Sequence, residues 1–288
     1  MKREHLGYLF ISPWLLGFLG LTVFPFLACL YLSFCRYDVM APPVWIGLGN
    51  YQELFFNDPL FWKSLQNTLL YAVLAVPLGI AAAVGLALLL NVEVRGVSVY
   101  RTVFFLPHIV PTVATSVVFM WILNPQIGLM NNVLGLFGVE GPAWLQDPQW
   151  AMRTLIFMSL WGVGGSVITY LAGLKDIPLS LYEAARCDGA GALARARHIT
   201  LPMLTPVIFF NLIMGIIGAF QYFTQAYIMT QGGPQDSTLF YSLYLFYRSW
   251  RYLDMGYASA MAWILFVVVS TTTFVVFKTH RRWVHYGS

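Results

Sequence analysis

The chain has 288 residues, of which 59% are hydrophobic and only 10% are charged. Soluble domains average roughly 45–50% apolar and about 25% charged residues, so this composition excludes a soluble enzyme and a disordered or fibrous chain. The net charge of +4 is too diffuse to indicate a nucleic-acid partner, and Cys29, Cys35 and Cys187 form neither a disulfide framework nor a metal-binding spacing. The composition indicates an integral membrane protein.

A helix that crosses the bilayer needs about 20 mostly apolar residues. Stretches of that length predict an all-α membrane protein with six transmembrane helices, at residues 7–34, 67–90, 103–123, 155–174, 204–229 and 257–277. The start Met1-Lys2-Arg3 resembles that of a signal peptide. However, the apolar run that follows is longer than the usual core of about 7–15 residues and no Ala-x-Ala site closes it, so we expect an uncleaved anchor.

The distribution of Lys and Arg predicts the orientation. With both termini in the cytoplasm, eleven of the 16 basic residues, from Lys2 to Arg282, fall inside. Five fall outside, namely Arg36, Lys63, Arg153, Arg248 and Arg251. Because membrane proteins concentrate Lys and Arg on the cytoplasmic side, we expect cytoplasmic N- and C-termini.

One apolar segment, residues 237–247, does not fit the six spans. It has only 11 residues and is bounded by Asp236 and Arg248, so it is too short to cross the bilayer. We expect it to form an amphipathic helix at the outer surface.

The sequence lacks the motifs of several kinds of catalysis. None of the four lysines follows a glycine, so the phosphate-binding Gly-Lys-Ser/Thr loop cannot occur. The five histidines lack the spacing of a helical metal site, and no Gly-x-Ser-x-Gly nucleophile motif is present. We therefore expect no enzymatic activity, no metal and no cofactor in this chain.

The polar residues within the predicted spans are almost all neutral. A charge at mid-bilayer costs about 2.5–3.5 kcal/mol or more, and no Asp, Glu, Lys or Arg lies in a central portion. His108 is the only titratable group at depth. The neutral polar residues are Thr112, Ser166, Thr169, Asn211, Gln221, Tyr222 and Gln225. They suit a neutral solute that forms hydrogen bonds, and Trp161 or Tyr222 offers a ring face for a sugar. The alternative is that these side chains form hydrogen bonds between helices, for about 0.6 kcal/mol each.

The longest cytoplasmic loop joins the fourth and fifth spans. Asp176 is a candidate N-cap, Pro178 fits a first helical turn, and residues 179–188 are expected to form a helix. The glycines at 189 and 191 end that helix, because glycine accepts a positive φ. A second short helix is expected from Ala192 to about residue 200, with Pro202 at the entry to the fifth span.

This loop carries a recognisable motif. Glu183-Ala-Ala-x-x-Asp-Gly189-Ala, followed by Ile199-x-Leu-Pro202, resembles the EAA loop in the membrane subunits of binding-protein-dependent ABC importers. Residues 171–178 and 181–183 extend this resemblance upstream. Other stretches are similar to the carbohydrate-uptake branch, in particular the larger permease of maltose transporters and its lactose and glycerol-phosphate relatives; they are 106–112, 124–128, 232–234 and 255–260. The resemblance covers essentially the whole chain, without the large periplasmic insertion and extra N-terminal helices of the maltose protein.

The resemblance implies a type I ABC importer permease fold, with one domain over residues 1–288, in the cytoplasmic membrane of a prokaryote. It implies that a coupling loop at about residues 175–203 contacts a separate ATPase subunit through Glu183, Ala184, Ala185, Asp188 and Gly189. The implied partners are two ATPase subunits that use ATP and Mg²⁺, a second and different permease in a pseudo-twofold pair, and an extracytoplasmic solute-binding protein.

The resemblance also implies a sugar site at mid-membrane, at the positions of this chain that match the family's site: His108, Thr112, Gly162, Gly165, Ala219 and Tyr222. For His108 an interhelical contact is the alternative, and for the Gly162–Gly165 run the alternative is close helix packing. Within importers, glycerol-phosphate or another polar solute competes with a sugar. A secondary transporter, a channel and a membrane-embedded enzyme remain as other classes.

Overall fold

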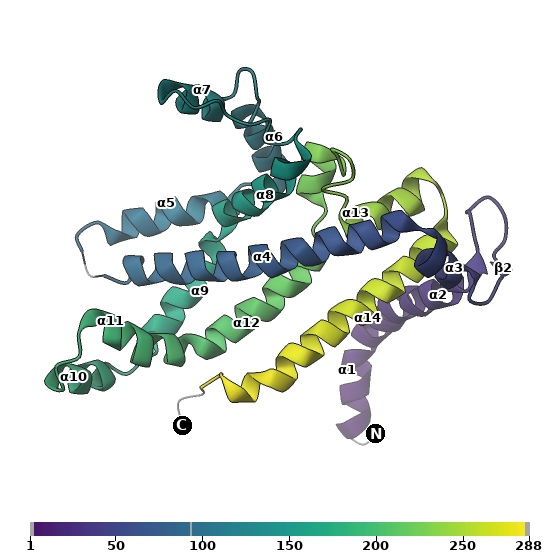
Figure 1. Cartoon of the computed structure of the whole chain (residues 1–288). Helices are drawn as coiled ribbons and strands as arrows, with labels where there is room; N and C mark the ends of the chain where they lie inside the picture. The colour runs from purple at the N-terminus through teal and green to yellow at the C-terminus, as the bar shows by residue number, and fades with distance from the viewer. Residues whose placement is uncertain (1–2, 93, 286–288) are drawn as a thin grey trace. The chain divides into compact units, whose positions relative to one another are not determined.

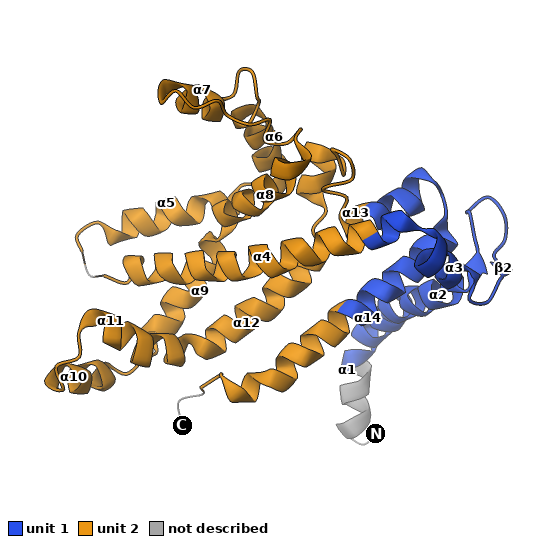
Figure 2. Cartoon of the chain, viewed as in Figure 1, with its two compact units in different colours: residues 1–62, 244–268 blue, residues 63–243, 269–288 orange. Residues whose placement is uncertain are grey.

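The computed structural model describes residues 3–92 and 94–285, so Lys2 of the charge count lies outside the described residues. The described chain divides into two compact units (Figures 1 and 2). Unit 1 contains the described residues up to Trp62 together with Tyr244–Val268, and unit 2 contains Lys63–Leu243 and the described residues from Val269 onward.

Unit 1 joins the N-terminal part of the chain to a segment from near its C-terminus. The amide of Asn50 donates to the carbonyl oxygens of Ser33 and Cys35, both at 2.9 Å, and so fixes the turn after the first helix. The elements of this unit are α1 (Arg3–Phe18), a π-helical turn (Leu19–Val23), α2 (Phe24–Ser33), the antiparallel pair β1 (Cys35–Arg36) and β2 (Val44–Trp45), α3 (Gly49–Gln52), two further π-helical turns (Glu53–Asn57 and Tyr247–Arg251) and the first part of α14 (Met255–Thr279).

Unit 2 is a helical bundle whose core lies between α4, α9 and α12 (Figure 1). Small residues of α4, such as Ala83 and Ala87, let the ring of Tyr170 and the side chain of Leu204 pack fully buried against it. Its elements are most of α4 (Pro59–Leu90), α5 (Val97–Ile109), α6 (Thr112–Ile122), α7 (Leu129–Leu136), α8 (Pro148–Ser159), a 3₁₀ turn (Leu160–Gly162), α9 (Gly164–Lys175), α10 (Leu179–Cys187), α11 (Ala192–Arg195), a π-helical turn (Ala196–Thr200), α12 (Leu201–Phe220), a second π-helical turn (Ala226–Thr230), the first half of α13 (Tyr241–Phe246), the last part of α14 and a C-terminal 3₁₀ turn (His280–Arg282).

The expectation of an all-helical membrane protein is confirmed, with four to six spans. Four helices are long and apolar enough to cross a membrane, namely Phe10–Ser33, Pro59–Leu90, Ala192–Phe220 and Met255–Arg282. They correspond to the first, second, fifth and sixth predicted spans. The third and fourth predicted spans are bent helix pairs, and each counts as a span only if its two halves cross the bilayer together.

The third predicted span is broken in its middle. Val97–Ile109 and Thr112–Ile122 meet at 98°, with Val110 in an extended conformation between them. A residue before proline is driven out of the helical region, and Pro111 has no N–H to continue the hydrogen-bonding pattern. Residues 103–123 are therefore two helices rather than the single helix expected.

The fourth predicted span bends by 48° at the 3₁₀ turn that precedes Gly164. The glycines at this bend allow close packing as well. A Cβ atom at Gly164 would lie 2.5 Å from the carbonyl oxygen of Phe104 on α5. The close helix packing considered for the Gly162–Gly165 run is therefore present at Gly164.

Two further expectations are corrected. The helix of the fifth span ends at Phe220 instead of continuing to residue 229. The segment 237–247 is not a surface helix, because Phe240, Tyr241 and Leu243 are completely buried. The backbone of this segment is bound to α4, because the N–H of Tyr241 donates to the hydroxyl oxygen of Thr68 at 2.9 Å.

Candidate functional site

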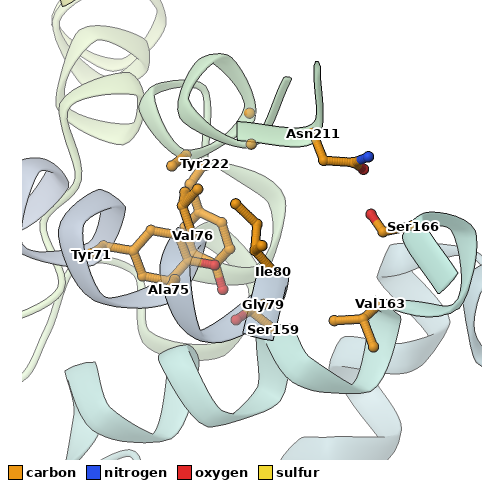
Figure 3. Close-up of a pocket in the computed structure, with 13 residues that line it drawn as sticks. Tyr71, Ala75, Val76, Gly79, Ile80, Ser159, Val163, Ser166, Asn211 and Tyr222 are labelled. Atoms are coloured by element: carbon orange, nitrogen blue, oxygen red, sulfur yellow. The ribbon is translucent and has the colours of Figure 1, made fainter. Parts of the chain in front are cut away.

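A cavity of about 240 Å³ opens between α4, the bend before α9, and α12 (Figure 3). Its wall is mainly apolar, with five polar side chains, and among the described residues no charged side chain lines it. These five are Tyr71, Ser159, Ser166, Asn211 and Tyr222. A neutral wall with a few hydrogen-bonding groups is typical of sites for uncharged polar ligands.

The polar groups stand on opposite sides of this cavity (Figure 3). On one side the rings of Tyr71 and Tyr222 are packed with their centroids 4.4 Å apart. On the other side are Ser166 of α9 and Asn211 of α12. The amide nitrogen of Asn211 donates to the carbonyl of Val207 at 2.9 Å, which leaves its amide oxygen as an acceptor.

The structure brings only part of the predicted sugar site to this cavity. Ala219 and Tyr222 line it. His108 and Gly165 meet each other beside it, because a Cβ atom at Gly165 would lie 2.7 Å from Nε2 of His108. Thr112 and Gly162 are exposed and do not line it.

Sequence reasoning missed the contribution of α4. Tyr71, Ala75, Val76 and Gly79 line the cavity, and Gly215 of α12 approaches Val76 so closely that a Cβ atom would lie 3.0 Å from its Cγ1. A small-residue pattern in two spans signals close packing but not which helices pair. The small residues of α4 and α12 were therefore visible in the sequence, but the sequence did not show that these two helices pack against each other.

The loop at residues 175–203 forms the predicted first short helix, α10, and then α11, which runs on into α12 (Figure 1). Gly189 has φ of +76°, its N–H donates to the carbonyl of Arg186 at 3.0 Å, and the N–H of Ala190 donates to that of Ala185 at 2.8 Å. This double hydrogen bond is the Schellman motif that ends a helix at glycine.

Two details of the coupling loop differ from expectation. The N-cap of α10 is Pro178 rather than Asp176, whose backbone stays helical as the C-cap of α9. The second short helix does not stop before Pro202. Because proline is accepted in the first turn of a helix, Ala192–Phe220 continues as one helical stretch.

The predicted coupling residues lie together on the outside of this loop. Glu183, Ala184, Asp188 and Gly189 are exposed, and Ala185 is half-buried. On the opposite side, the hydroxyl of Tyr182 lies 2.9 Å from that of Thr200, which is buried. The exposed surface is therefore carried by a helix that is anchored to the start of α12.

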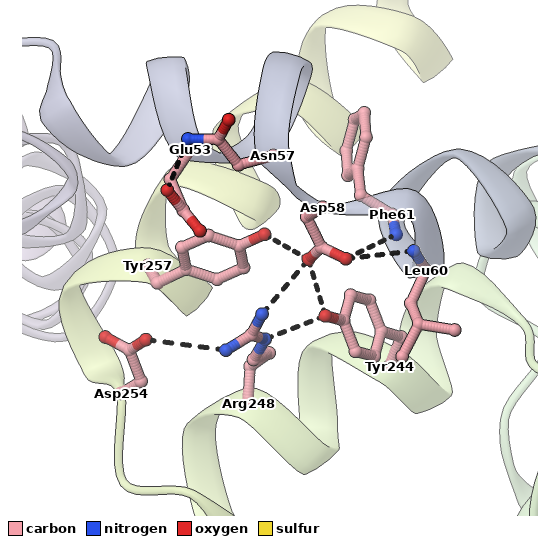
Figure 4. A network of polar contacts seen from close by, with 9 residues as sticks. All are labelled: Glu53, Asn57, Asp58, Leu60, Phe61, Tyr244, Arg248, Asp254 and Tyr257. Carbon is pink, nitrogen blue, oxygen red and sulfur yellow. Dashed lines mark hydrogen bonds and ion pairs between the residues drawn. The ribbon is translucent and has the colours of Figure 1, made fainter.

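A second polar cluster lies in unit 1, around Asp58 at the start of α4 (Figure 4). The carboxylate of Asp58 accepts from the hydroxyls of Tyr244, at 2.5 Å, and Tyr257, and from Nη2 of Arg248, at 3.1 Å. It also accepts from the backbone N–H groups of Leu60 and Phe61. Asp58 thus joins the helix start to α13 and to the start of α14.

The ionisation of this cluster follows from its hydrogen bonds. Burial disfavours the charged carboxylate of Asp58, but donation from Tyr244, Tyr257 and Arg248 outweighs it, so the pKa of Asp58 lies below its usual value. Burial raises the pKa of the neighbouring Asp254. Arg248 stacks on Tyr257, with Cζ 4.3 Å from the ring centroid, so the ion pair is closed in by aromatic rings.

Comparison with known proteins agrees with this architecture. Residues 75–285 match the family described as the binding-protein-dependent transport system inner membrane component. The chain is 48% identical over 293 residues to the probable ABC transporter permease protein YesP of Bacillus subtilis, covering 100% of this chain and 94% of the relative. It is 36% identical over 283 residues to the lactose transport system permease protein LacF of Rhizobium radiobacter, covering 96% and 94%.

The fold also matches a solved structure of a bacterial ABC transporter involved in the import of the acidic polysaccharide alginate. The TM-score is 0.84 at 26% identity, and the match covers 98% of this chain and 96% of the transporter chain.

The chain therefore belongs to the family of binding-protein-dependent transport system inner membrane components. It is a multi-pass permease of the bacterial inner membrane, of the carbohydrate-uptake type, and a transport subunit rather than an enzyme. It acts in a binding-protein-dependent ABC importer.

Proposed function

We propose that this permease carries a sugar, either a mono- or an oligosaccharide, into the cytoplasm. The observation that supports this proposal best is the neutral wall of the cavity around Tyr71, Asn211 and Tyr222. Hydroxyl, phenol and amide groups match the hydroxyls of a sugar, and apolar surface matches its C–H groups. The names of relatives support the same class of substrate, since one is a lactose permease and another imports alginate.

We further propose the assembly in which the permease works. A second permease completes a pseudo-twofold pair, and two separate ATPase subunits bind the coupling loops and use ATP and Mg²⁺. The exposed surface at Glu183, Ala184, Asp188 and Gly189 supports this role. Closure of the ATPase pair moves the loops, and the anchored helix passes the motion to α12.

Glycerol-phosphate is the main competing substrate. A phosphate group is bound most strongly by Arg or Lys side chains. In the described part of the chain the cavity wall provides neither Arg nor Lys. The cavity therefore favours an uncharged ring over a phosphate ester.

The test is ATP-dependent uptake by proteoliposomes that contain the complete importer and the binding protein. Asn211→Leu keeps the volume of the side chain but removes its amide, and we expect uptake of the sugar that the binding protein delivers to fall about tenfold. Thr169→Val is the matched control, because the Thr169 hydroxyl bonds only to the carbonyl of Gly165, at 3.2 Å, and is exposed away from the cavity.

Two results would contradict the proposal. Uptake that proceeds without ATP would exclude the assembly, and uptake of a phosphate ester in preference to every sugar would exclude the substrate class.

Purification of the permease should also recover a second permease and ATPase subunits.

A further inference from the structure

Three aromatic rings pack together at one end of the cavity that Tyr71, Asn211 and Tyr222 line. They belong to Tyr71 of α4, to Tyr222 just beyond α12, and to Phe240 just before α13. The centroid of the Tyr222 ring lies 4.4 Å from that of Tyr71 and 4.8 Å from that of Phe240, and the other two centroids lie 5.3 Å apart. Tyr71, Tyr222 and Phe240 are 4%, 9% and 0% exposed, so this aromatic cluster is almost sealed from solvent.

The direction of two helices identifies this end of the cavity. In the predicted orientation α4 runs inward from the outer side, and its lining residues extend from Tyr71 to Ile80. The helix α12 runs outward, and the lining continues from Asn211 to Tyr222. Figure 3 shows the two tyrosines together and apart from Asn211 and Ser166. The aromatic cluster therefore lies between the cavity and the outside of the cell.

Two of the three rings belong to one part of the structure. Tyr71 lies in α4, and the segment that carries Phe240 is bound to the same helix on both sides of that residue. The side-chain amide of Asn67 donates to two carbonyl oxygens of the segment, at 2.8 and 3.0 Å. The hydroxyl of Thr68 accepts the backbone N–H that follows Phe240, at 2.9 Å. The rings of Tyr71 and Phe240 are thus held by α4.

The third ring lies at the end of a different helix. α12 ends at Phe220 and the next helical residue is 224, so Tyr222 lies in a short break of the chain. The hydroxyl of Ser242 donates to the carbonyl oxygen of Phe220 at 2.9 Å and holds the end of α12 in place. At its other end α12 follows the contact between Tyr182 and Thr200. One continuous helix therefore joins the coupling loop to Tyr222.

We propose that the aromatic cluster is the gate that closes this cavity to the outside, with Tyr71 and Phe240 as its fixed half and Tyr222 as its moving half. When α12 shifts, the ring of Tyr222 leaves the other two rings and the cavity opens outward. Dispersion and edge-to-face contacts are individually weak, so a helix shift can break and remake them. This inference rests on the proposed assembly, because the ATPase subunits supply the motion of the coupling loop.

Two pairs of cysteines test the gate in the complete importer, after the three native cysteines are replaced by serine. Tyr222→Cys with Phe240→Cys joins the two halves, and Tyr71→Cys with Phe240→Cys lies within the fixed half and is the matched control. Under mild oxidation both pairs should form a disulfide in the ATP-free complex. A short bifunctional thiol reagent replaces the oxidant where the two sulfur atoms do not reach each other.

The complex is then trapped with ATP and vanadate before oxidation. We expect the yield of the Tyr222→Cys/Phe240→Cys disulfide to fall about tenfold, as for a two-state equilibrium that ATP shifts to the open form. The yield of the Tyr71→Cys/Phe240→Cys disulfide should not change, because α4 holds both positions. Mass spectrometry of the digested chain measures the two yields.

A second measurement tests whether the rings seal the cavity. Ser166→Cys places a thiol on the cavity wall away from the rings, and a maleimide that cannot cross the membrane is added to right-side-out vesicles without ATP. Phe240→Ala should raise the labelling rate about tenfold, because the closed form loses one of its three rings. Phe240 does not line the cavity, so its wall stays unchanged. Phe240→Leu keeps most of the bulk and serves if Phe240→Ala does not fold.

Phe223→Ala is the control for this measurement. Phe223 follows Tyr222 directly and stacks on Tyr227 with centroids 5.4 Å apart, but it belongs neither to the aromatic cluster nor to the cavity wall. Labelling of Ser166→Cys should stay slow in this variant.

Several results would overturn the inference. Equal yields of the Tyr222→Cys/Phe240→Cys disulfide with and without vanadate would make the three rings a static part of the core. Loss of the Tyr71→Cys/Phe240→Cys disulfide on trapping would show that α4 holds no fixed half. Labelling of Ser166→Cys at the same rate with and without the Phe240 ring would show that the rings do not seal the cavity.

Neither measurement uses a sugar, so these results would refute the gate alone. A purified complex that lacks ATPase subunits, or that takes up solute without ATP, would refute the proposed function instead.

Discussion

The hydroxyl of Tyr182 on α10 lies 2.9 Å from the hydroxyl of Thr200, although 18 residues separate them. Tyr182 also packs against the core between α4, α9 and α12. This contact fixes the coupling helix to the first turn of the long helix that reaches the cavity. In the proposed coupling role, this contact would pass motion imposed on α10 to α12.

Removal of this hydroxyl should weaken coupling. We expect Tyr182→Phe to lower uptake several-fold while ATP hydrolysis by the complex continues, because the hydrogen bond, about 1 kcal/mol, holds the angle of α10. The measurement is the ratio of solute imported to ATP hydrolysed in proteoliposomes. Tyr100→Phe is the control, because Tyr100 is exposed and lies on α5. An unchanged ratio in Tyr182→Phe would show that the contact plays no part in coupling.

Gly189→Asp should abolish uptake while leaving membrane insertion intact. The positive φ of Gly189 costs other residues about 1–2 kcal/mol, and an added carboxylate at a helix C-terminus is unfavourable. The chain itself has room for a side chain there, since no neighbouring atom lies within 4 Å of the position that a Cβ would occupy. The loss should therefore arise where the ATPase subunit binds.

Gly191→Ala is the control for this substitution, because Gly191 has an ordinary φ of −67° and equally open surroundings. It should transport normally. Insertion is checked by the amount of full-length protein in washed membranes. Wild-type uptake by Gly189→Asp would refute the assignment of the coupling surface.

Asp58→Ala should destabilise unit 1 by about 3–5 kcal/mol, because Arg248 would lose its partner in a largely buried place. The side chain of Asp58 is 5% exposed, while that of Asp254, 3.9 Å from Arg248, is 38% exposed. Asp254→Ala should therefore cost much less. Thermal unfolding of the two variants in detergent measures the difference, and equal midpoints would contradict it.

The same cluster predicts a pH dependence. The pKa of Asp58 is lowered in the folded protein, so its carboxylate stabilises the fold above its ordinary pKa of about 3.9, and this contribution is lost as the pH falls through the lower folded-state value. Unfolding midpoints of wild type and Asp58→Asn should differ most near neutral pH and converge below about pH 4. Asp254 is present in both proteins, so its titration does not change the difference between their unfolding midpoints. A difference between the two unfolding midpoints that grows as the pH falls would contradict this prediction.

The orientation can be tested with the native Cys187, which is exposed. In intact cells a maleimide that cannot cross the membrane should leave it unlabelled, and lysis in a denaturing detergent should expose it. Gln126→Cys, at an exposed position expected outside, should label in intact cells and serves as the positive control. Labelling of Cys187 before lysis would reverse the predicted topology.

The sequence by itself determined the membrane class, the helical spans and the coupling loop. Each depends on local information: apolar length sets a span, the position of Lys and Arg sets its direction, and Gly189 ends α10 because only that residue accepts the backbone angle at low cost. The family motif added the role of Glu183 and its neighbours. The membrane class and the glycine end of α10 are confirmed by the structure, because neighbouring residues decide them, whereas the direction of the spans and the role of Glu183 stay predictions.

Only the tertiary structure decided what the helices form together. The sequence did not indicate that Tyr71 of α4 meets Tyr222, or that the segment with Tyr241 is buried, because both depend on which helix faces pair. The ion network of Asp58 and Arg248 joins residues 190 positions apart, a separation over which no local pattern operates.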